Sequence, residues 1–306
     1  MTGAASRILV IKHGAFGDFI LATGPFKAIR THHPAAHIVL LTTKPYADLA
    51  RASGWFDEVW IDDRPGLGRP LALWRLARQL RGGRFQRVYD LQTSDRSSLY
   101  YRLLPHPKPD WSGIARGASH PHANPQRDFM HTQERQREQL NMAGIADVPG
   151  PDVSWLHGES APAVPTPFAL LVPGGSAHRP GKRWPAAQYI ELASRLKARG
   201  IAPVLLGAGA EAALLEEIAT ASGALNLCGK TGFGEMADLA RLATVAIGND
   251  TGPMHLIAAA GCRSVVLFSH ESDPALCAPR GASVTVLRRD PLAALGVDEV
   301  LGTLAL

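Results

Sequence analysis

The 306-residue sequence predicts an α/β protein made of two doubly wound domains, each built on a parallel sheet. Short continuous apolar runs, suited to strands buried on both faces, alternate with segments of helical periodicity. This rhythm occurs twice, before and after a proline-rich stretch. Several apolar runs end in glycine-containing turns, and ligands of such sheets bind at the carboxyl ends of the strands. We therefore expect a ligand site at those strand ends.

The first half begins with the apolar run RILVIK, a glycine-containing turn and a helical repeat over residues 19–30. Further strands are expected at residues 37–41, 58–61 and 88–91, and helices at 46–52, 71–80, 97–104 and 132–143. Between the last two helices, residues 105–127 contain five prolines and lose the periodicity. We predict a long, mostly irregular segment near a cleft there, because long loops are often functional.

The proline-rich residues 148–167 are the expected linker. We place an N-terminal domain at residues 1–155 and a C-terminal domain at 156–306, with the option that the last helix packs back on the N-terminal domain. In the second half, strands are expected at residues 168–172, 202–206, 225–227, 245–247 and 264–268. Helices are expected at 186–198, from 209 to about 222, at 233–242 and from 253 onward.

Composition narrows the class of protein. The formal net charge of +5 and the pI of about 9.3 favour anionic partners, such as phosphates or an acidic membrane surface. Nucleic acid is not expected, because lysine-rich runs and aromatic residues interleaved with basic ones are missing. No apolar run is long enough to span a membrane and no secretory pattern opens the chain, so we expect a cytoplasmic protein. The three scattered cysteines favour neither disulfides nor a zinc site.

The stretch AIGNDTGPMHLIAAAG, residues 246–261, predicts the end of a strand, a polar turn and a helix beginning at Pro253. Backbone N–H groups at such a helix start form an anion site. Thr251 could add a hydroxyl group, and His255 lies one helical turn further on. The alternative is an ordinary turn in which Asp250 or Thr251 caps the helix. The local pattern leaves both interpretations open.

Four blocks of sequence together resemble the bacterial heptosyltransferases, glycosyltransferase family 9. They are ILVIKHGAFGDFILATGP at residues 8–25, the PGGS and GKRWP segments within 173–185, GKT at 229–231, and GNDTGPMHLIAAAG. The family builds the inner core of lipopolysaccharide from ADP-heptose. The resemblance implies the GT-B fold, in which two Rossmann-like domains face each other across a cleft. It also implies an N-terminal domain for the acceptor, a C-terminal domain for the donor, and inverting transfer without a metal.

The resemblance assigns two catalytic residues. Asp18 is the expected general base, which takes the proton from the acceptor hydroxyl. Lys182 is expected to neutralise the leaving pyrophosphate. Without the resemblance, Asp18 could equally cap the helix that follows it, and Lys182 would be a solvated surface lysine. The HGAFGD turn is not a GxGxxG motif, which argues against a nicotinamide-dependent dehydrogenase.

The resemblance also implies the residues that bind the donor. Backbone N–H groups of Thr251 and Gly252 are expected to hold the pyrophosphate, and Asp250 the hydroxyl groups of the donor sugar. The other expected donor-binding residues are Gly174, Gly175, Ser176, Glu211, Lys230, Thr231 and His255. Ser176 stands where some members of the family carry consecutive threonines. Glu211 could instead start a helix, and His255 could pack inside the helix layer.

The acceptor side is less specific. Family acceptors are anionic and lipid-linked, so basic side chains are expected around the cleft. We single out Gly17, Arg64, Arg96 and Arg127, with Arg69 and Arg102 also available. The histidines at 120, 122 and 131 lack the spacing of metal ligands, and no metal site is expected.

The sequence therefore predicts an inverting, metal-independent glycosyltransferase that moves heptose from ADP-heptose onto a lipopolysaccharide core acceptor. We expect no cofactor, a nucleotide sugar as donor, an anionic lipid-linked oligosaccharide as acceptor, and a monomer peripheral on the inner membrane. Two alternatives remain. One is a transferase or epimerase for another nucleotide sugar, and the other is a non-catalytic member that binds a sugar nucleotide.

Overall fold

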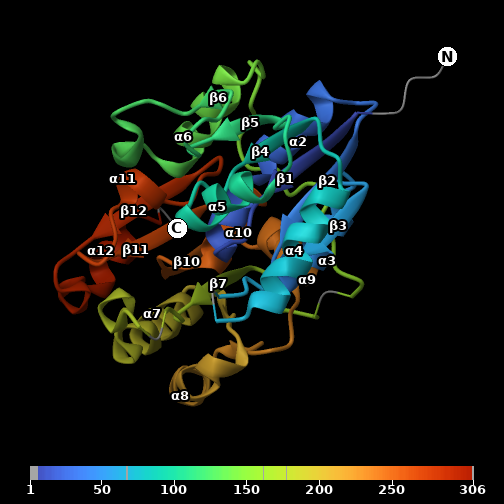
Figure 1. Cartoon of the computed structure of the whole chain (residues 1–306). Helices are drawn as coiled ribbons and strands as arrows, with labels where there is room; N and C mark the ends of the chain where they lie inside the picture. The colour runs from blue at the N-terminus through green and yellow to red at the C-terminus, as the bar shows by residue number, and fades with distance from the viewer. Residues whose placement is uncertain (1–5, 67, 161, 177, 305–306) are drawn as a thin grey trace. The chain divides into compact units, whose positions relative to one another are not determined.

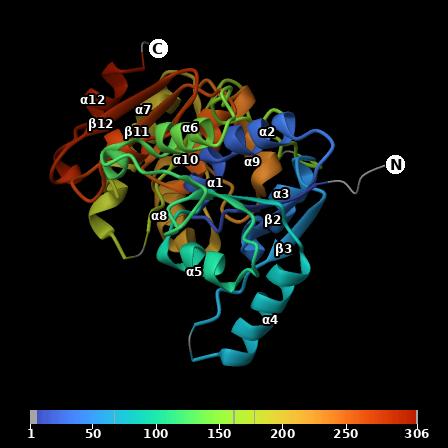
Figure 2. The same ribbon diagram turned by 45° about the horizontal axis from the view of Figure 1, so that its top comes forward.

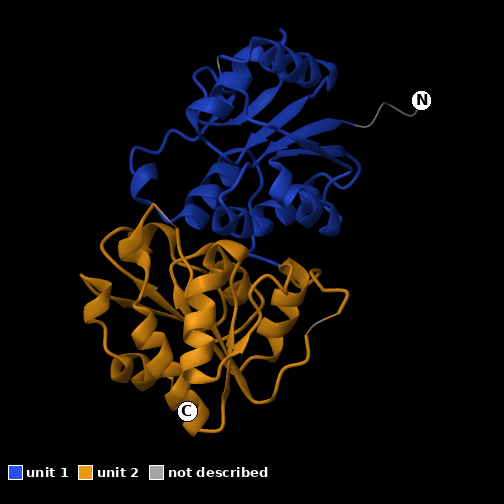
Figure 3. Ribbon diagram, turned by 90° about the horizontal axis from the view of Figure 1, so that it is seen from below, with its two compact units in different colours: residues 1–152 blue, residues 153–306 orange. Residues whose placement is uncertain are grey.

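The structure is a computed structural model that describes residues 6–66, 68–160, 162–176 and 178–304 (Figure 1). The chain divides into two compact units, residues 1–152 and residues 153–306 (Figure 3). This division falls inside the expected proline-rich linker, close to the boundary placed at residues 155 and 156. Each unit contains one parallel six-stranded sheet.

Unit 1 has the strand order β3-β2-β1-β4-β5-β6. The order reverses beside β1, where Ile11 pairs with Leu41 of β2 and with Asp90 of β4. Side chains that follow these three strands therefore meet at one edge, the usual ligand position of such a sheet. The strands are β1 (Arg7–Ile11), β2 (His37–Thr42), β3 (Glu58–Ile61), β4 (Arg87–Asp90), β5 (Asp110–Gly113) and β6 (His120–Pro121).

Helices cover both faces of this sheet (Figure 2). On one face, apolar side chains of β1 and β2 pack against α4 and α5 around the buried ring of Tyr100. On the other, α1, α2 and α6 contact one another. The helices are α1 (Phe16–Leu21), α2 (Thr23–His32), α3 (Ala47–Ala52), α4 (Pro70–Gly82), α5 (Asp95–Leu103) and α6 (Thr132–Met142), with 3-10 turns η1 (Lys44–Tyr46) and η2 (Arg127–Phe129).

The segment 105–127 is mostly irregular, as predicted, but it also contains β5 and β6, which were not predicted. Both strands are short, and β5 carries Asp110 and Ser112 in place of an apolar run. Trp111 between them is fully buried in the unit 1 core. Pro121 lies in β6 at the edge of the sheet, where a missing N–H is tolerated. Because of these prolines and polar residues, the sequence pattern did not indicate the two strands.

Unit 2 repeats the architecture with the order β12-β11-β10-β7-β8-β9. Its strands are β7 (Phe168–Val172), β8 (Ala202–Leu205), β9 (Leu225–Asn226), β10 (Val245–Asn249), β11 (Ser264–Phe268) and β12 (Val284–Arg288). Its helices are α7 (Ala186–Ala198), α8 (Ala212–Ser222), α9 (Phe233–Leu242), α10 (Gly252–Ala259), α11 (Pro274–Cys277) and α12 (Val297–Gly302), with 3-10 turns η3 (Pro180–Lys182), η4 (Gly209–Glu211) and η5 (Leu292–Ala294).

The C-terminal end of the chain also differs from the prediction. No strand was predicted at the residues of β12. This strand is only partly buried and forms the edge of the sheet. The last helix, α12, packs against α7, and its side chains Val297, Val300 and Leu301 belong to the unit 2 core. Their helical spacing gives α12 an apolar face that packs inside unit 2.

Over the described ranges, each helix is either too short or too polar to cross a bilayer.

Candidate active site

The turn after β1 is held by residues that follow the neighbouring strands. The Thr43 hydroxyl donates to the His13 carbonyl oxygen at 2.8 Å, and Gln92 Oε1 accepts from the His13 N–H at 2.8 Å. Gly14 has a φ of +121°, and a Cβ at this position would lie 2.5 Å from the ring of Tyr46. Glycine is therefore required here for both backbone conformation and space. Together these contacts fix the start of α1.

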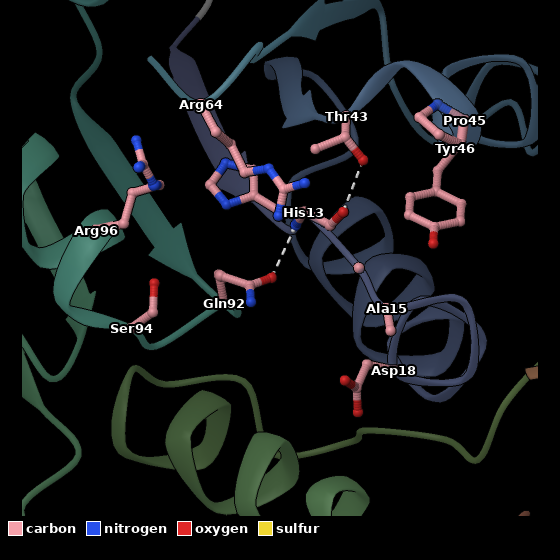
Figure 4. A pocket seen from close by; sticks show the side chains of 11 residues that line it. His13, Ala15, Asp18, Thr43, Pro45, Tyr46, Arg64, Gln92, Ser94 and Arg96 are labelled. Carbon is pink, nitrogen blue, oxygen red and sulfur yellow. Dashed lines mark hydrogen bonds between the residues drawn. The ribbon is translucent and has the colours of Figure 1, made fainter. Parts of the chain in front are cut away.

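A cavity of about 650 Å³ opens beside this turn (Figure 4). Asp18, in the first turn of α1, lines it together with Arg64, which follows β3, and Arg96 of α5. Ala15 occupies the N-cap position of α1, so Asp18 does not cap this helix. The remaining lining residues are His13, Gly14, Ala15, Thr43, Pro45, Tyr46, Gln92 and Ser94. The cavity combines one carboxylate with two guanidinium groups, which suits an anionic ligand that carries a hydroxyl group.

A buried carboxylate, Asp62, organises one wall of this cavity. It accepts hydrogen bonds from the Tyr100 hydroxyl and, at 2.7 Å, from the Arg64 N–H, and it lies 3.0 Å from His13 Nε2. Burial acts to raise the pKa of Asp62, but the hydrogen bonds from His13 and Tyr100 outweigh it, so the pKa lies below its usual value. Asp62 is thus an anion that orients His13 and the backbone of Arg64.

A second pair of buried charges, Lys12 and Asp90, lies where β1 and β4 end. Lys12 Nζ donates to the Leu91 carbonyl oxygen at 3.3 Å, and Asp90 Oδ1 accepts from the Thr93 N–H at 2.9 Å. Burial raises the pKa of Asp90 to about 6, against the lowering effect of the Thr93 N–H. Burial lowers the pKa of Lys12, while the nearby carboxylate of Asp18 opposes that change. Lys12 is therefore an electrostatic neighbour of Asp18.

Of the residues singled out for the acceptor, Arg64 and Arg96 line the cavity. Arg96 Nη1 also donates to the Pro65 carbonyl oxygen at 3.2 Å, which ties α5 to the loop after β3. Gly17 is buried in α1. Arg127 donates to the Thr93 hydroxyl at 2.6 Å, outside the described lining of the cavity. Arg102 lines a separate hollow of about 400 Å³ beside α5, and Arg69 immediately precedes α4.

In unit 2, the loop after β7 is organised by Asn249, a fully buried residue at the end of β10. Its Nδ2 donates to the carbonyl oxygens of Pro173 and Gly174 at 2.8 and 3.1 Å. Its Oδ1 accepts from the Trp184 N–H and the Tyr189 hydroxyl, both at 3.1 Å. One amide group therefore joins the ends of β7 and β10 to the start of α7.

Lys182 and Asp250, both expected in the site, form an ion pair with an Nζ–Oδ2 distance of 2.6 Å. Their side chains are only 12% and 7% exposed, so Lys182 is not the solvated surface lysine of the alternative interpretation. The Ser272 hydroxyl donates to the same carboxylate oxygen at 2.7 Å. The structure thus places a partly buried ammonium group beside a carboxylate and a hydroxyl group at the carboxyl edge of the sheet.

Glu211 joins two glycine turns at the same edge. Its carboxylate accepts from the Gly175 N–H at 3.0 Å and from the Ala208 N–H at 2.9 Å. A Cβ at Gly174 would lie 1.9 Å from the Glu211 carboxylate, so this close approach needs glycine. Arg183 donates to the Gly175 carbonyl oxygen at 2.7 Å. Glu211 therefore binds the loop backbone and also occupies the N-cap position of α8.

The turn that precedes α10 has Thr251 at the N-cap position, without a side-chain cap, and Gly252 as the first helical residue. Thr251 Oγ1 is buried with no hydrogen-bond partner among the described residues. Thr251 is therefore the N-cap residue, as the alternative expected, but its side chain makes no capping hydrogen bond. His255 is buried within α10, as the helix-layer alternative expected.

The remaining predicted donor residues lie on exposed loops. Ser176 is exposed after the two glycines of its loop. Lys230 and Thr231 follow β9, and the Lys230 ammonium donates to the Asn226 carbonyl oxygen at 3.3 Å. The Gly229 N–H donates to the Gly207 carbonyl oxygen at 2.9 Å, which brings the GKT turn beside the turn after β8. The predicted donor residues are thus gathered along one sheet edge.

Sequence reasoning missed the supporting residues His13, Asp62, Asp90, Asn249 and Ser272. Asp62 directly follows a predicted strand of unit 1 and Asp90 lies near the carboxyl end of another, which was a usable signal. Asn249 lies inside the GND turn that had been singled out. Ser272 carries no sequence signal, because its role depends on how the segment after β11 folds back.

The structure is a two-domain α/β protein of the doubly wound class. Unit 1 has a cavity lined by a carboxylate, and unit 2 has glycine turns around an ion pair at the carboxyl edge of its sheet. Solved structures confirm the GT-B fold. A glycosyltransferase of family 9 from Veillonella parvula has a TM-score of 0.82 at 21% identity over 99% of this chain and 98% of its own. An E. coli heptosyltransferase solved with ADP-2-deoxy-2-fluoro heptose has a TM-score of 0.75 at 19% identity over 97% and 98%.

The model of glycosyltransferase family 9 (heptosyltransferase) matches residues 73–295, so the chain belongs to this family and is a glycosyltransferase. The lipopolysaccharide heptosyltransferase 2 of Salmonella typhimurium is 25% identical over 92% of this chain and 88% of that protein. The lipooligosaccharide heptosyltransferase 2 of Haemophilus influenzae is 33% identical, but the match spans 37% of this chain and 34% of the relative. The family inferred from the four sequence blocks is confirmed.

Proposed function

We propose that this glycosyltransferase moves heptose from ADP-heptose onto an anionic, lipid-linked lipopolysaccharide core, with inversion at the anomeric carbon and without a metal ion. The observation that carries the proposal is the cavity of unit 1, where Asp18 lies with Arg64 and Arg96. A carboxylate accepts a proton from a sugar hydroxyl, and guanidinium groups bind phosphate or carboxylate groups of the same acceptor.

Unit 1 is the acceptor domain in this proposal. Asp18 accepts the proton of the attacking hydroxyl, and Arg64 and Arg96 bind the anionic groups of the acceptor. Lys12 lies close enough to interact electrostatically with Asp18. Gly17 shapes the first turn of α1, and Arg127 is assigned to acceptor groups that extend beyond the cavity.

Unit 2 is the donor domain. The glycine turns after β7 and before α10 offer backbone N–H groups to the diphosphate, and Thr251 Oγ1 offers a hydroxyl group that has no partner among the described residues. Ser176, Lys230, Thr231 and His255 complete the donor site, which Glu211 supports from the loop backbone. The related E. coli enzyme solved with a fluorinated ADP-heptose supports ADP-heptose as the donor.

Lys182 and Asp250 have different roles in the donor site. Asp250 pairs with the Lys182 ammonium group. When donor binds, the diphosphate becomes a second anion near that ammonium group, and Lys182 stabilises the negative charge that grows on the leaving diphosphate. Asp250 is then available to accept hydrogen bonds from hydroxyl groups of the sugar.

The reaction forms one bond and breaks one. The oxygen of the acceptor hydroxyl attacks the anomeric carbon from the face opposite the diphosphate, and its proton passes to the Asp18 carboxylate. The bond between the anomeric carbon and the diphosphate oxygen breaks, and the electron pair leaves with ADP. Attack from the opposite face inverts the anomeric configuration, so one carboxylate is sufficient.

The test is a transfer assay with ADP-heptose and a truncated core lipid, run in the presence of EDTA. The proposal expects stoichiometric ADP release, a product heavier by one heptose, and an anomeric configuration opposite to that of the donor by NMR. ADP-glucose and UDP-glucose serve as donor controls and should react far more slowly. No ADP release with any ADP-sugar, or transfer that stops in EDTA, would contradict the proposal.

A further inference from the structure

Helix α4 presents an exposed face that has no apolar partner within unit 1. Its inner face is buried through Leu76, Ala77 and Leu80. On the opposite face, Leu71 and Trp74 are 60% and 55% exposed, far more than expected for large apolar side chains. Figure 2 shows the first turns of α4 projecting away from the other helices of unit 1.

The same exposed face is strongly basic. Arg75 lies four residues after Leu71 and Arg78 four residues after Trp74, and the Arg78 guanidinium lies over the Trp74 ring at 5.6 Å. Among the described residues, neither arginine is part of an ion pair. The surrounding sequence, residues 64–87, holds seven arginines and no aspartate or glutamate. We call Leu71, Trp74, Arg75 and Arg78 the α4 surface.

We propose that the α4 surface docks on a bilayer that contains anionic lipids. Trp74 and Leu71 enter the boundary between headgroups and acyl chains, and Arg75 and Arg78 bind the phosphate groups beside them. This combination of exposed tryptophan, leucine and arginine on one helical face is typical of helices that lie in a membrane interface. A nucleic acid would pair with the arginines but would leave Leu71 exposed to water.

Helix α4 begins close in the chain to the cavity proposed for the lipid-linked acceptor. A link between membrane docking and the acceptor rests on the proposed function. Arg64 lines the acceptor cavity, and Pro70 at the start of α4 comes only six positions after it in the chain. A chain of that length spans at most about 20 Å. The Arg96 hydrogen bond to Pro65 anchors this connection to α5. An acceptor could therefore remain in the bilayer while its sugar groups enter the cavity.

The binding is tested by sedimentation of the full chain with vesicles of phosphatidylcholine and phosphatidylglycerol, without acceptor or donor. Pure phosphatidylcholine vesicles are the neutral reference, and binding to them should be weaker. Each arginine that reaches an anionic surface contributes a factor of about five, so Arg75→Gln/Arg78→Gln should lower the partition coefficient about 25-fold. Leu71→Ser/Trp74→Ser should lower it at least about tenfold.

Matched controls lie in unit 2. Leu242→Ser removes a leucine that is 68% exposed, and Lys197→Gln/Arg199→Gln removes the same charge from an exposed part of α7 and its end. Neither control should change vesicle binding. The emission difference between the wild type and Trp74→Phe should shift to shorter wavelength when anionic vesicles are added, because Trp74 leaves water.

Three results would overturn the inference. The first is that the α4 variants bind anionic vesicles as strongly as the wild type and the unit 2 controls do. The second is that vesicle binding falls for the arginine variant but not for Leu71→Ser/Trp74→Ser, which would exclude insertion of the apolar side chains. The third is binding of a short DNA duplex, but not of vesicles, through the same residues. Transfer to a deacylated acceptor in vesicle-free solution reports the proposed function separately, because it requires no docking.

Discussion

The ion pair between Lys182 and Asp250 makes the most specific prediction about unit 2. Lys182→Met removes the ammonium group and leaves a carboxylate that is only 7% exposed. Breaking a buried pair from one side costs about 3–5 kcal/mol, because a buried charge loses its partner. The Ser272 hydroxyl still donates to Asp250, so we expect the lower end of that range, about 3 kcal/mol.

The double-mutant cycle isolates the interaction. Asp250→Asn should cost less, about 1–2 kcal/mol, because the longer lysine side chain can turn toward water. The double variant Lys182→Met/Asp250→Asn leaves no unpaired charge. Its cost should therefore fall short of the sum of the two single costs by about 2 kcal/mol.

The cost is measured by hydrogen exchange and mass spectrometry on peptides from β7 and β10, since these amides report the opening of unit 2 without signal from unit 1. The exposed pair Arg195 and Asp298, also in unit 2, is the control and should show no measurable coupling. A coupling for Lys182 and Asp250 below about 0.5 kcal/mol would place this pair with ordinary surface pairs and refute the reasoning.

Three further predictions concern single residues. Gly14→Ala places a Cβ 2.5 Å from the Tyr46 ring at a φ of +121° and should destabilise unit 1 by at least about 2 kcal/mol by calorimetry, whereas Gly302→Ala, in open space, should not. Because the folded pKa of Asp90 is raised to about 6 from an ordinary value near 3.8, the folded chain holds a proton that the unfolded chain loses, and stability falls as pH rises from about 4 to 6. Asp90→Asn should remove that decline and raise the stability at neutral pH by about 2–3 kcal/mol; an unchanged pH slope would contradict this. Glu211→Gln leaves one acceptor for two backbone N–H groups and should weaken ADP binding by about tenfold in calorimetric titration, unlike Glu217→Gln on α8.

The predictable part of the fold was the part with strong apolar periodicity. The runs at β1, β2, β7 and β11 are buried along nearly their whole length, so a continuous apolar pattern identified them. The strands β5 and β12 were not predicted, because their burial depends on the elements that pack beside them in the fold. Asp110 and Ser112 do not form an apolar run, and β12 is half-exposed at a sheet edge.

The sequence named candidate site residues but did not indicate which partners their side chains contact. Lys182 and Asp250 were both expected there, yet their direct contact depends on how the η3 turn meets the end of β10, which are 68 residues apart. Similarly, the interaction of His13 with Asp62 joins the ends of β1 and β3 across the sheet. Such contacts follow from strand order, which local sequence patterns do not encode. The placement of Arg127 on Thr93 is of the same kind.

The central claim is that Asp18 accepts the proton of the acceptor hydroxyl. The most direct measurement is the single-turnover rate of transfer by Asp18→Asn, together with its affinity for ADP and with Asp48→Asn as a control on an exposed aspartate. We expect the Asp18 variant to lose about 10²–10⁴-fold in rate with unchanged ADP affinity, and the Asp48 variant to match the wild type. A transfer rate for Asp18→Asn equal to that of the wild type would contradict the account.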